Sequence, residues 1–163
     1  MTVPVRFRRS RIFIDTGPLV AVYDASDSFH SSAIQFRDEV LLRTQVEMFC
    51  SIYVVAETLN NLQRLVQSGQ IRKADFESAA RGITDDAPFQ NLPADEGTVR
   101  RALEIIDGFP FFSFTDATNL ALMERGGIRN IFSFDSDFDR YSIKSGHQKV
   151  YLARHPSSWQ ILD

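Results

Sequence analysis

Residues 11–15 read Arg-Ile-Phe-Ile-Asp, and Thr16, Gly17 and Pro18 follow directly. The three apolar residues form a short run that is typical of a buried strand. The run stops at an acid, and the Gly-Pro pair favours a turn immediately after it. This stretch therefore predicts a brief inner strand with Asp15 at its carboxyl end.

Strand-like runs and helix-like stripes alternate along the rest of the chain. Further strands are expected over residues 46–51, 89–92, 130–134 and 149–152. Helical stripes are expected over residues 29–40, 55–66, 72–83, 99–106 and 117–123, the last with Thr115 as its N-cap and Gly126-Gly127 as its stop. Strands that alternate with helices imply crossover connections and a parallel sheet covered on both faces. The predicted class is therefore α/β.

The length and composition favour one domain. The chain has 163 residues, 44% of them apolar, which suits a single core over residues 1–163. We expect a basic arm over residues 1–10 and a packing tail over residues 153–163 at the two ends. No window has the roughly 20 apolar residues of a membrane helix, and no signal-type segment is seen. These features predict a cytoplasmic protein.

The charge and the single cysteine exclude several classes of function. A net charge of −3 is the wrong sign for a protein that coats nucleic acid by bulk electrostatics. It does not exclude a nuclease, because carboxylates around divalent cations form a locally neutral or positive site. Cys50 is the only cysteine, so neither an intrachain disulfide nor a thiolate metal site is expected.

Four acids are predicted to lie at the carboxyl edge of the sheet. Asp15 ends the first strand, Asp135 ends the fourth, Glu57 follows the second, and Asp116 begins the helix before the fourth. Ligands of such sheets bind where the strand order reverses. If the first and fourth strands are neighbours, as in the order 3-2-1-4-5, all four carboxylates can reach one point. Oxygen ligands without His or Cys suit Mg²⁺ or Mn²⁺.

Each acid alone also has an ordinary structural explanation, as a turn former, a helix-start charge or a solvated position. Together they repel one another unless a cation is bound. We therefore predict that Asp15, Asp116 and Asp135 bind metal, and that Glu57 completes the shell or orients the attacking water. Asp137 is a candidate for an outer position, whereas Asp139 is expected to be a solvated loop acid.

Four short motifs occur in an order and spacing typical of one family. They are Ile12-Phe-Ile-Asp15-Thr16, Val54-Val-Ala-Glu57, Ser113-Phe-Thr-Asp116-Ala117 and Ser133-Phe-Asp135-Ser-Asp137-Phe138. This series resembles that of PIN domains, which include the toxin ribonucleases of bacterial and archaeal toxin-antitoxin pairs. The resemblance extends from about Arg11 to about Tyr151.

The resemblance implies a single PIN-like domain, a sheet of order 3-2-1-4-5, and Mg²⁺- or Mn²⁺-dependent endonucleolytic cleavage of RNA. The family's acids correspond to Asp15, Glu57, Asp116 and Asp135. Thr16 and Ser133 match hydroxyl positions that support the pocket, although threonine is commoner where Ser133 stands. In the toxins an antitoxin covers the groove and homodimers are common. The run Phe109-Pro-Phe-Phe-Ser-Phe114 either contributes to such a contact or packs into the core.

Three other functions compete with this interpretation. A non-catalytic PIN-like module that binds RNA or protein is disfavoured, because such a domain is expected to have lost an acid. A receiver-type phosphoacceptor needs adjacent acids after the first strand, where this chain has Thr-Gly-Pro. A Ser/His/Asp hydrolase is disfavoured because there is no Gly-x-Ser-x-Gly motif and the three histidines, His30, His147 and His155, fall in expected loops or helix starts.

Overall fold

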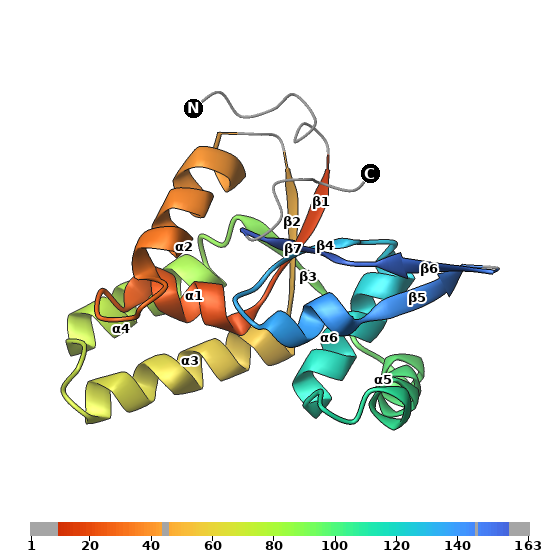
Figure 1. Cartoon of the computed structure of the whole chain (residues 1–163). Coiled ribbons are helices and arrows are strands. Elements are labelled where there is room, and N and C mark those ends of the chain that lie inside the picture. Colours follow the sequence, from red (N-terminus) through yellow and green to blue (C-terminus); the bar gives the residue numbers. More distant parts are fainter. Residues whose placement is uncertain (1–9, 44–45, 146, 157–163) are drawn as a thin grey trace.

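The computed structural model describes residues 10–43, 46–145 and 147–156 (Figure 1). Residues 1–9 of the expected basic arm and residues 157–163 of the expected tail lie outside the described residues. No helix within the described part is long and apolar enough to cross a membrane. The elements are β1 (Arg11–Ile14), α1 (Thr16–Tyr23), α2 (His30–Phe36), the π-helical turn η2 (Arg37–Leu41), β2 (Glu47–Ser51), α3 (Ile52–Gln67), α4 (Lys73–Thr84), β3 (Phe89–Leu92), α5 (Glu96–Gly108), α6 (Phe114–Gly126), β4 (Asn130–Phe132), the 3-10 turn η3 (Ser136–Arg140), β5 (Ser142–Ser145), β6 (Gln148–Tyr151) and β7 (Ala153–His155).

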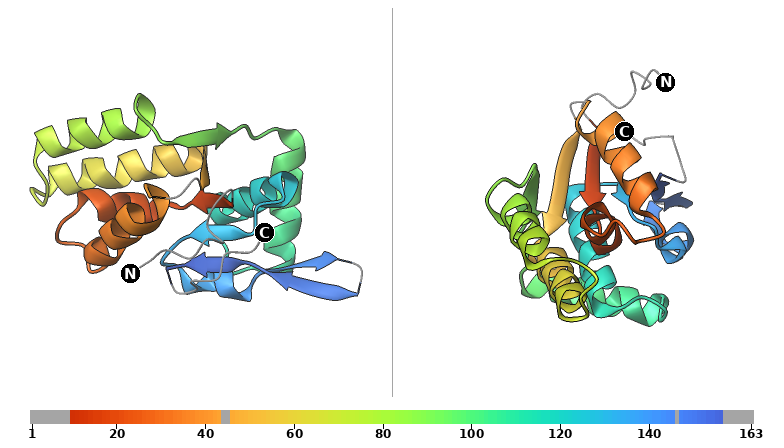
Figure 2. Two further views of the ribbon diagram at one scale, coloured as in Figure 1. Left: turned by 90° about the horizontal axis from the view of Figure 1, so that it is seen from above. Right: turned by 90° about the vertical axis from the view of Figure 1, so that its left-hand side faces the viewer.

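Five strands form a parallel sheet in the order β3-β2-β1-β4-β7. This order confirms the predicted fold, with the first strand between the second and the fourth. The fifth strand, however, was placed wrongly over residues 149–152. Residues 148–151 pair with β5 in an antiparallel hairpin that projects from the body (Figure 2), and residues 153–155, expected in the tail, form the edge strand β7.

Burial explains the difference between β6 and β7. Gln148, Lys149 and Tyr151 of β6 are exposed, so this strand has no apolar face to bury against a helix layer. Ala153 and His155 of β7 are both buried, and they alternate with a half-buried arginine as expected for a strand at the sheet edge. The hairpin strand therefore stays outside the layered core.

The sheet has a hydrophobic core on each face. Successive side chains of a strand point to opposite faces, and β1 follows this rule. Phe13 belongs to the larger core, formed with α3, α4, α5 and α6, whereas Ile12 and Ile14 pack with α1, α2 and η2. Figure 1 shows α1 and α2 on one side of β1 and β2, and α5 and α6 on the other. Helices therefore cover both faces, as predicted.

Helix α6 starts at Ser113 rather than at the predicted N-cap, Thr115. Ser113 Oγ accepts a hydrogen bond from Asp116 N at 3.1 Å, and the Asp116 carboxylate accepts one from Ser113 N at 3.1 Å. This reciprocal pair is a capping box. The predicted stop is confirmed, because Gly127 adopts a left-handed conformation with φ of 61° that ends the helix. Asp116 thus lies in the first turn, as expected.

The helical stripe over residues 29–40 is only partly buried. Ala33, Phe36 and Val40 lie in the core, as predicted. Phe29 does not: it precedes α2 as its N-cap residue and is 48% exposed. The stripe therefore begins one turn later than the sequence suggests.

Candidate active site

The carboxyl ends of β1 and β4 lie side by side. The two strands pair in parallel with Ile14 opposite Phe132, and Asp15 N donates to Phe132 O at 3.0 Å. The chain leaves β1 toward β2 and β3 and later returns to β4 on the other side of β1, so the strand order reverses here. Such a switch point is where α/β sheets bind ligands. Asp15 and Asp135 follow these two strands directly.

Asp15 is the buried acid of the site, with 7% of its surface exposed. Burial raises the pKa of Asp15 to about 7. Hydrogen bonds from the Ser133 side chain and the Thr16 backbone lower this pKa, whereas the negative charges of Asp116 and Glu57 raise it. Ionised Asp15 is therefore disfavoured unless a positive charge lies beside it.

Ser133 is a fully buried residue that connects two of the acids. Its Oγ donates to Asp15 Oδ2 at 2.7 Å and accepts from Asp135 N at 3.0 Å. Its own backbone N donates to His155 O at 3.2 Å, which ties the position to β7. One hydroxyl group therefore holds the Asp15 carboxyl group and the backbone of Asp135 in a fixed relation.

Replacing Ser133 by Ala is expected to lower the free energy of unfolding by about 1–3 kcal/mol, because a buried carboxyl group and a backbone N–H both lose a hydrogen-bond partner. Urea denaturation measures this change. Ser133→Thr is the control, since it retains the hydroxyl group, and its loss should be clearly smaller. Equal stability of Ser133→Ala and the wild type would show that the two bonds contribute nothing.

Asp116 is half-buried at the start of α6. Its Oδ2 accepts a hydrogen bond from Ser113 Oγ at 2.6 Å in addition to the capping bond from Ser113 N. Burial raises the pKa of Asp116, and the charges of Asp135 and Asp137 raise it further, against the lowering effect of the Ser113 bonds. Since Asp116 also acts on Asp15, it is coupled to acids that follow both β1 and β4.

Glu57 reaches the same edge from α3, which begins directly after β2. Its side chain is exposed, and its Oε2 accepts a hydrogen bond from Thr16 Oγ1 at 3.0 Å. Thr16 is the first residue of α1, so this bond joins the start of α1 to the second turn of α3. The negative charge of Glu57 also contributes to the raised pKa of Asp15.

The acids after β4 have different surroundings. Asp135 is exposed, and its Oδ1 accepts from Asp137 N at 2.8 Å as the cap of η3. Asp137 forms an ion pair with Arg140 at 3.3 Å and still contributes to the raised pKa of Asp116. Asp139 instead pairs with Arg154 at 2.6 Å. Asp137 thus acts electrostatically on Asp116, whereas Asp139 is held by Arg154.

The structure brings the four predicted acids to one edge, but they do not form a ready set of metal ligands. Among residues 10–43, 46–145 and 147–156, no three His, Cys, Asp or Glu side chains are placed so that they could hold one ion. The acids bond instead to neighbouring groups, such as Ser113 and Thr16. The donors around buried Asp15 are nevertheless carboxylate and hydroxyl oxygens, which are the hard ligands that Mg²⁺ and Mn²⁺ prefer.

Sequence reasoning missed a buried polar contact beneath the acids. Ser51 Oγ donates to Asn119 Oδ1 at 2.7 Å and accepts from Val54 N at 3.2 Å as the N-cap of α3. Ser51 and Asn119 are both fully buried. The contact therefore joins the helix of Glu57 to the helix of Asp116. The available signal was Ser51 itself, a good N-cap residue just before a helical stripe.

The aromatic run over residues 109–114 mainly packs into the core, one of its two predicted roles. Phe109 packs against Tyr141 in a tilted arrangement with ring centroids 5.1 Å apart, and the ring centroids of Phe112 and Phe138 are 5.4 Å apart. Phe114 differs, since it is 41% exposed. The run therefore supplies one surface ring beside Asp116.

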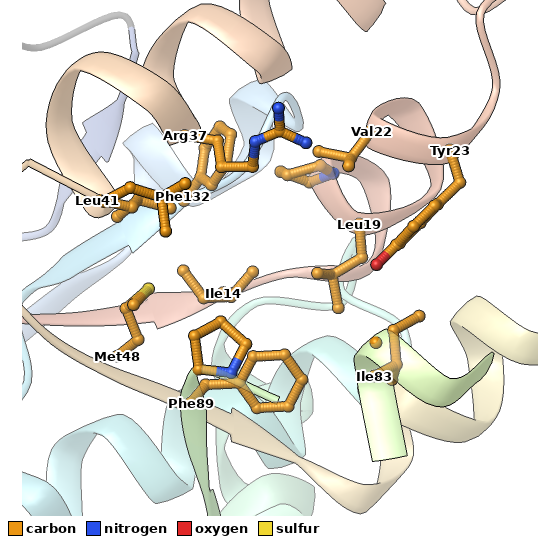
Figure 3. A pocket seen from close by; sticks show the side chains of 14 residues that line it. Ile14, Leu19, Val22, Tyr23, Arg37, Leu41, Met48, Ile83, Phe89 and Phe132 are labelled. Atoms are coloured by element: carbon orange, nitrogen blue, oxygen red, sulfur yellow. The ribbon is translucent and has the colours of Figure 1, made fainter. Parts of the chain in front are cut away.

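A separate cavity of about 110 Å³ lies on the α1 side of the sheet (Figure 3). Its lining side chains include Ile14, Met48 and Phe89 and are apolar apart from Arg37 and Tyr23. No carboxylate lines it. The described residues that line this cavity thus offer no carboxylate to a metal ion, and the cavity is distinct from the acidic edge.

Cys50 is fully buried, and burial raises the pKa of its thiol to about 12. Only the thiolate is an effective nucleophile or metal ligand. The surroundings of Cys50 therefore disfavour the reactive form of its thiol.

The fold and the site together define a parallel α/β domain with coupled acids at its topological switch point. Over residues 12–144 the sequence matches the PIN domain family, and the chain belongs to that family. The resemblance seen in the four motifs is thereby confirmed.

A solved structure shares this fold. The crystal structure of Mycobacterium tuberculosis VapC20, described as a sarcin-ricin loop cleaving toxin, superposes with a TM-score of 0.62. The two sequences are 26% identical, and the match covers 79% of this chain and 93% of that chain. A comparison with curated proteins gave no match.

Proposed function

We propose that the chain is a Mg²⁺- or Mn²⁺-dependent endoribonuclease that hydrolyses phosphodiester bonds in RNA. The observation that carries this proposal is the coupling of the acids. The pKa of Asp15 is raised by burial and by Asp116 and Glu57, and Ser133 joins Asp15 to Asp135. Such a group at the switch point of a PIN fold supports a centre that binds cations and cleaves phosphodiesters.

Asp15, Asp116 and Asp135 would hold the cation, and Glu57 would complete its shell or orient the attacking water. A bound divalent cation supplies positive charge that offsets the charge of the phosphodiester in its transition state and lowers the pKa of a water molecule.

The hydroxyl groups around the acids orient them. Ser133 bonds to Asp15 Oδ2, Ser113 bonds to Asp116 Oδ2, and Thr16 bonds to Glu57 Oε2. Each hydroxyl thus holds one oxygen of one carboxylate. Groups oriented in this way lose less side-chain freedom when they engage a ligand. These bonds support a catalytic centre over the alternative, a non-catalytic module that binds RNA or protein.

We further propose that the protein is the toxin of a toxin-antitoxin pair, acts in the cytoplasm, and forms a homodimer. The likeness to VapC20 over most of that chain supports this role. The neighbouring reading frame tests it. We expect a gene for a short DNA-binding protein there, and its absence would count against the toxin role but not against the nuclease.

The nuclease proposal is tested by incubating purified protein with ribosomal RNA that contains the sarcin-ricin loop, with Mg²⁺, Mn²⁺ or EDTA. We expect internal cuts with either cation and none with EDTA. Equal cutting in EDTA would overturn the metal dependence. An absence of cutting on ribosomal RNA, transfer RNA and unstructured RNA alike would favour the non-catalytic module.

Mn²⁺ is expected to raise the melting temperature of the metal-free protein, because an ion that binds only the folded state stabilises it. At a Mn²⁺ concentration about 100 times the Kd the gain is ~2.7 kcal/mol, which for a chain of this size corresponds to about 5–10 °C. Differential scanning fluorimetry measures the shift, and the Asp116→Asn variant is the control that should respond much less. A melting temperature that does not change with millimolar Mn²⁺ contradicts the prediction.

A further inference from the structure

Two pairs of aromatic rings flank the acidic edge, and neither pair has a part in the proposed chemistry. Phe29 stacks on Phe134, and Tyr53 contacts Phe114 edge to face. Phe29 and Phe114 are 48% and 41% exposed, so each pair presents one ring to the surface.

The pair of Phe29 and Phe134 is anchored in the core. Their ring centroids are 4.4 Å apart with an interplanar angle of 10°. Phe134 also contacts Phe132 at 5.8 Å, and Phe132 contacts buried Phe36 at 4.6 Å. The backbone N of Phe29 donates to Asp27 Oδ1 at 2.7 Å, which fixes the residue before α2. One face of the Phe29 ring is covered by Phe134, so its exposed surface lies on the opposite face and the edges.

The pair of Tyr53 and Phe114 bridges the first turns of α3 and α6. The ring centroids are 6.5 Å apart and the planes are perpendicular. Phe114 is the first residue of α6, and Tyr53 is the second residue of α3. Both helices start at fixed caps, Ser113 and Ser51, so the two rings are held by well-anchored backbone.

The two pairs lie beside the acids and on opposite faces of the sheet. Phe134 directly precedes Asp135 and packs on the α1 and α2 side. Phe114 lies two residues before Asp116 on α6, which covers the other face. Tyr53 lies one helical turn before Glu57 on the same helix. Each pair therefore belongs to elements that also carry an acid, one pair on each face of the sheet.

Among the described residues, the two arginines that follow Asp135 on η3 and β7 are engaged by acids. The chain carries a net charge of −3, and nearby Arg140 and Arg154 are already paired with Asp137 and Asp139. Stacking of a base on an aromatic ring needs no net positive charge and accepts every base. The exposed ring of each pair thus offers RNA a contact that does not depend on charge.

We propose that the Phe29–Phe134 and Tyr53–Phe114 pairs are two base-stacking subsites, which bind unpaired nucleobases on either side of the phosphodiester that lies at the acids. This inference rests on the proposed function. A stacked duplex has no free base faces to offer, so the subsites select RNA segments whose bases are unpaired and splayed apart.

Steady-state cleavage of a short single-stranded RNA in Mn²⁺ tests the proposal. Phe29→Leu and Phe114→Leu are each expected to raise KM about five- to tenfold, at the lower end of the range measured for loss of one stacked base. kcat should stay within about twofold, since stacking binds the ground state and the transition state alike. Phe29→Tyr and Phe114→Tyr retain a flat ring and should restore a KM near that of the wild type.

The matched control is Tyr151→Leu, which removes a 50% exposed ring from the β5–β6 hairpin rather than from an element that carries an acid. Its KM should equal that of the wild type. A melting curve of each variant shows whether it is folded. An unchanged KM in both Phe→Leu variants would overturn the stacking proposal, and so would a fall in kcat without a rise in KM. Cleavage of RNA by the wild-type protein would still support the nuclease proposal in either case.

Binding separates this inference from the proposed function. Fluorescence anisotropy of the Asp116→Asn protein with labelled single-stranded RNA, or with the same strand in a duplex, needs no cleavage. When Phe29→Leu or Phe114→Leu is introduced into this Asp116→Asn protein, the Kd for the single strand should rise at least about fivefold. The Kd for the duplex should stay unchanged. Equal losses on both RNAs, or no loss on either, would show that these rings do not stack bases and would favour a protein contact instead.

Discussion

Replacing Asp116 by Asn is expected to reduce the rate of RNA cleavage at least about a hundredfold. Mutation of a residue that only hydrogen-bonds to a metal ligand already lowers metal affinity or activity about 10–100-fold, and Asp116 is a proposed ligand itself. The fold should persist, since the Asn side chain can still accept a hydrogen bond from Ser113 and close the start of α6. Cleavage rates at saturating Mn²⁺ and circular dichroism of the same samples measure the two effects.

Asp75 offers a matched control for this substitution. It occupies the corresponding position in the first turn of α4, where it accepts a hydrogen bond from Arg72 N at 3.2 Å. Asp75→Asn therefore makes the same chemical change at a helix start away from the acidic edge, and it should leave cleavage unchanged. Wild-type activity of Asp116→Asn would remove this residue from the proposed centre.

Replacing Asp15 by Asn is expected to abolish cleavage and, in metal-free buffer at pH 8, to stabilise the protein. Burial raises the pKa of Asp15 to about 7 from 3.8, and one pKa unit corresponds to about 1.4 kcal/mol. The gain should thus be about 4 kcal/mol. Asn carries no charge to bury, and its carbonyl oxygen can still accept from Ser133.

The stabilisation should depend on pH in one direction. Between pH 4 and pH 7 the unfolded chain releases the Asp15 proton while the folded protein retains it, so the stability of the wild type falls as the pH rises through this window. Asp15→Asn lacks this loss. The difference between the two proteins should therefore be absent near pH 4, grow up to about pH 7, and stay constant above it.

Urea denaturation in EDTA from pH 4 to pH 8 measures this difference. Asp107→Asn, which neutralises an exposed acid of α5, is the control and should track the wild type. A variant at Asp15 that is less stable than the wild type at pH 8 would show that ionising this buried group carries no cost. Together the two outcomes would describe an acid that lowers the stability of the fold and is required for its chemistry.

Much of the sheet was predictable because its strands are short apolar runs with clear ends. The range 89–92 was predicted as it is observed, and β1, β2 and β4 were placed to within two residues. Residues 149–152 were misplaced, because a hairpin strand and a sheet strand have the same local pattern. Only the packing of β7 against β4 distinguishes them.

The places of the four acids along the strands and helices were predictable, but their contacts were not. Asp15 and Asp135 were expected to follow strands and Asp116 to begin a helix, and the structure has them there. The contact between Ser51 and Asn119 joins residues 68 positions apart. A local sequence pattern cannot predict a contact between residues so far apart.

The amino-acid sequence by itself determined the α/β class, the family and the positions of the acids at strand ends and helix starts, because hydrophobic period and strand-end residues are properties of neighbouring positions. Tertiary structure alone decided which acid is buried, which hydroxyl holds it, and which aromatic rings remain at the surface. These depend on the order in which strands pair, and that order brings distant residues together: Ser133 reaches Asp15 across 118 positions. Burial and electrostatic coupling arise from such contacts, so the raised pKa of Asp15 appears only in the folded chain.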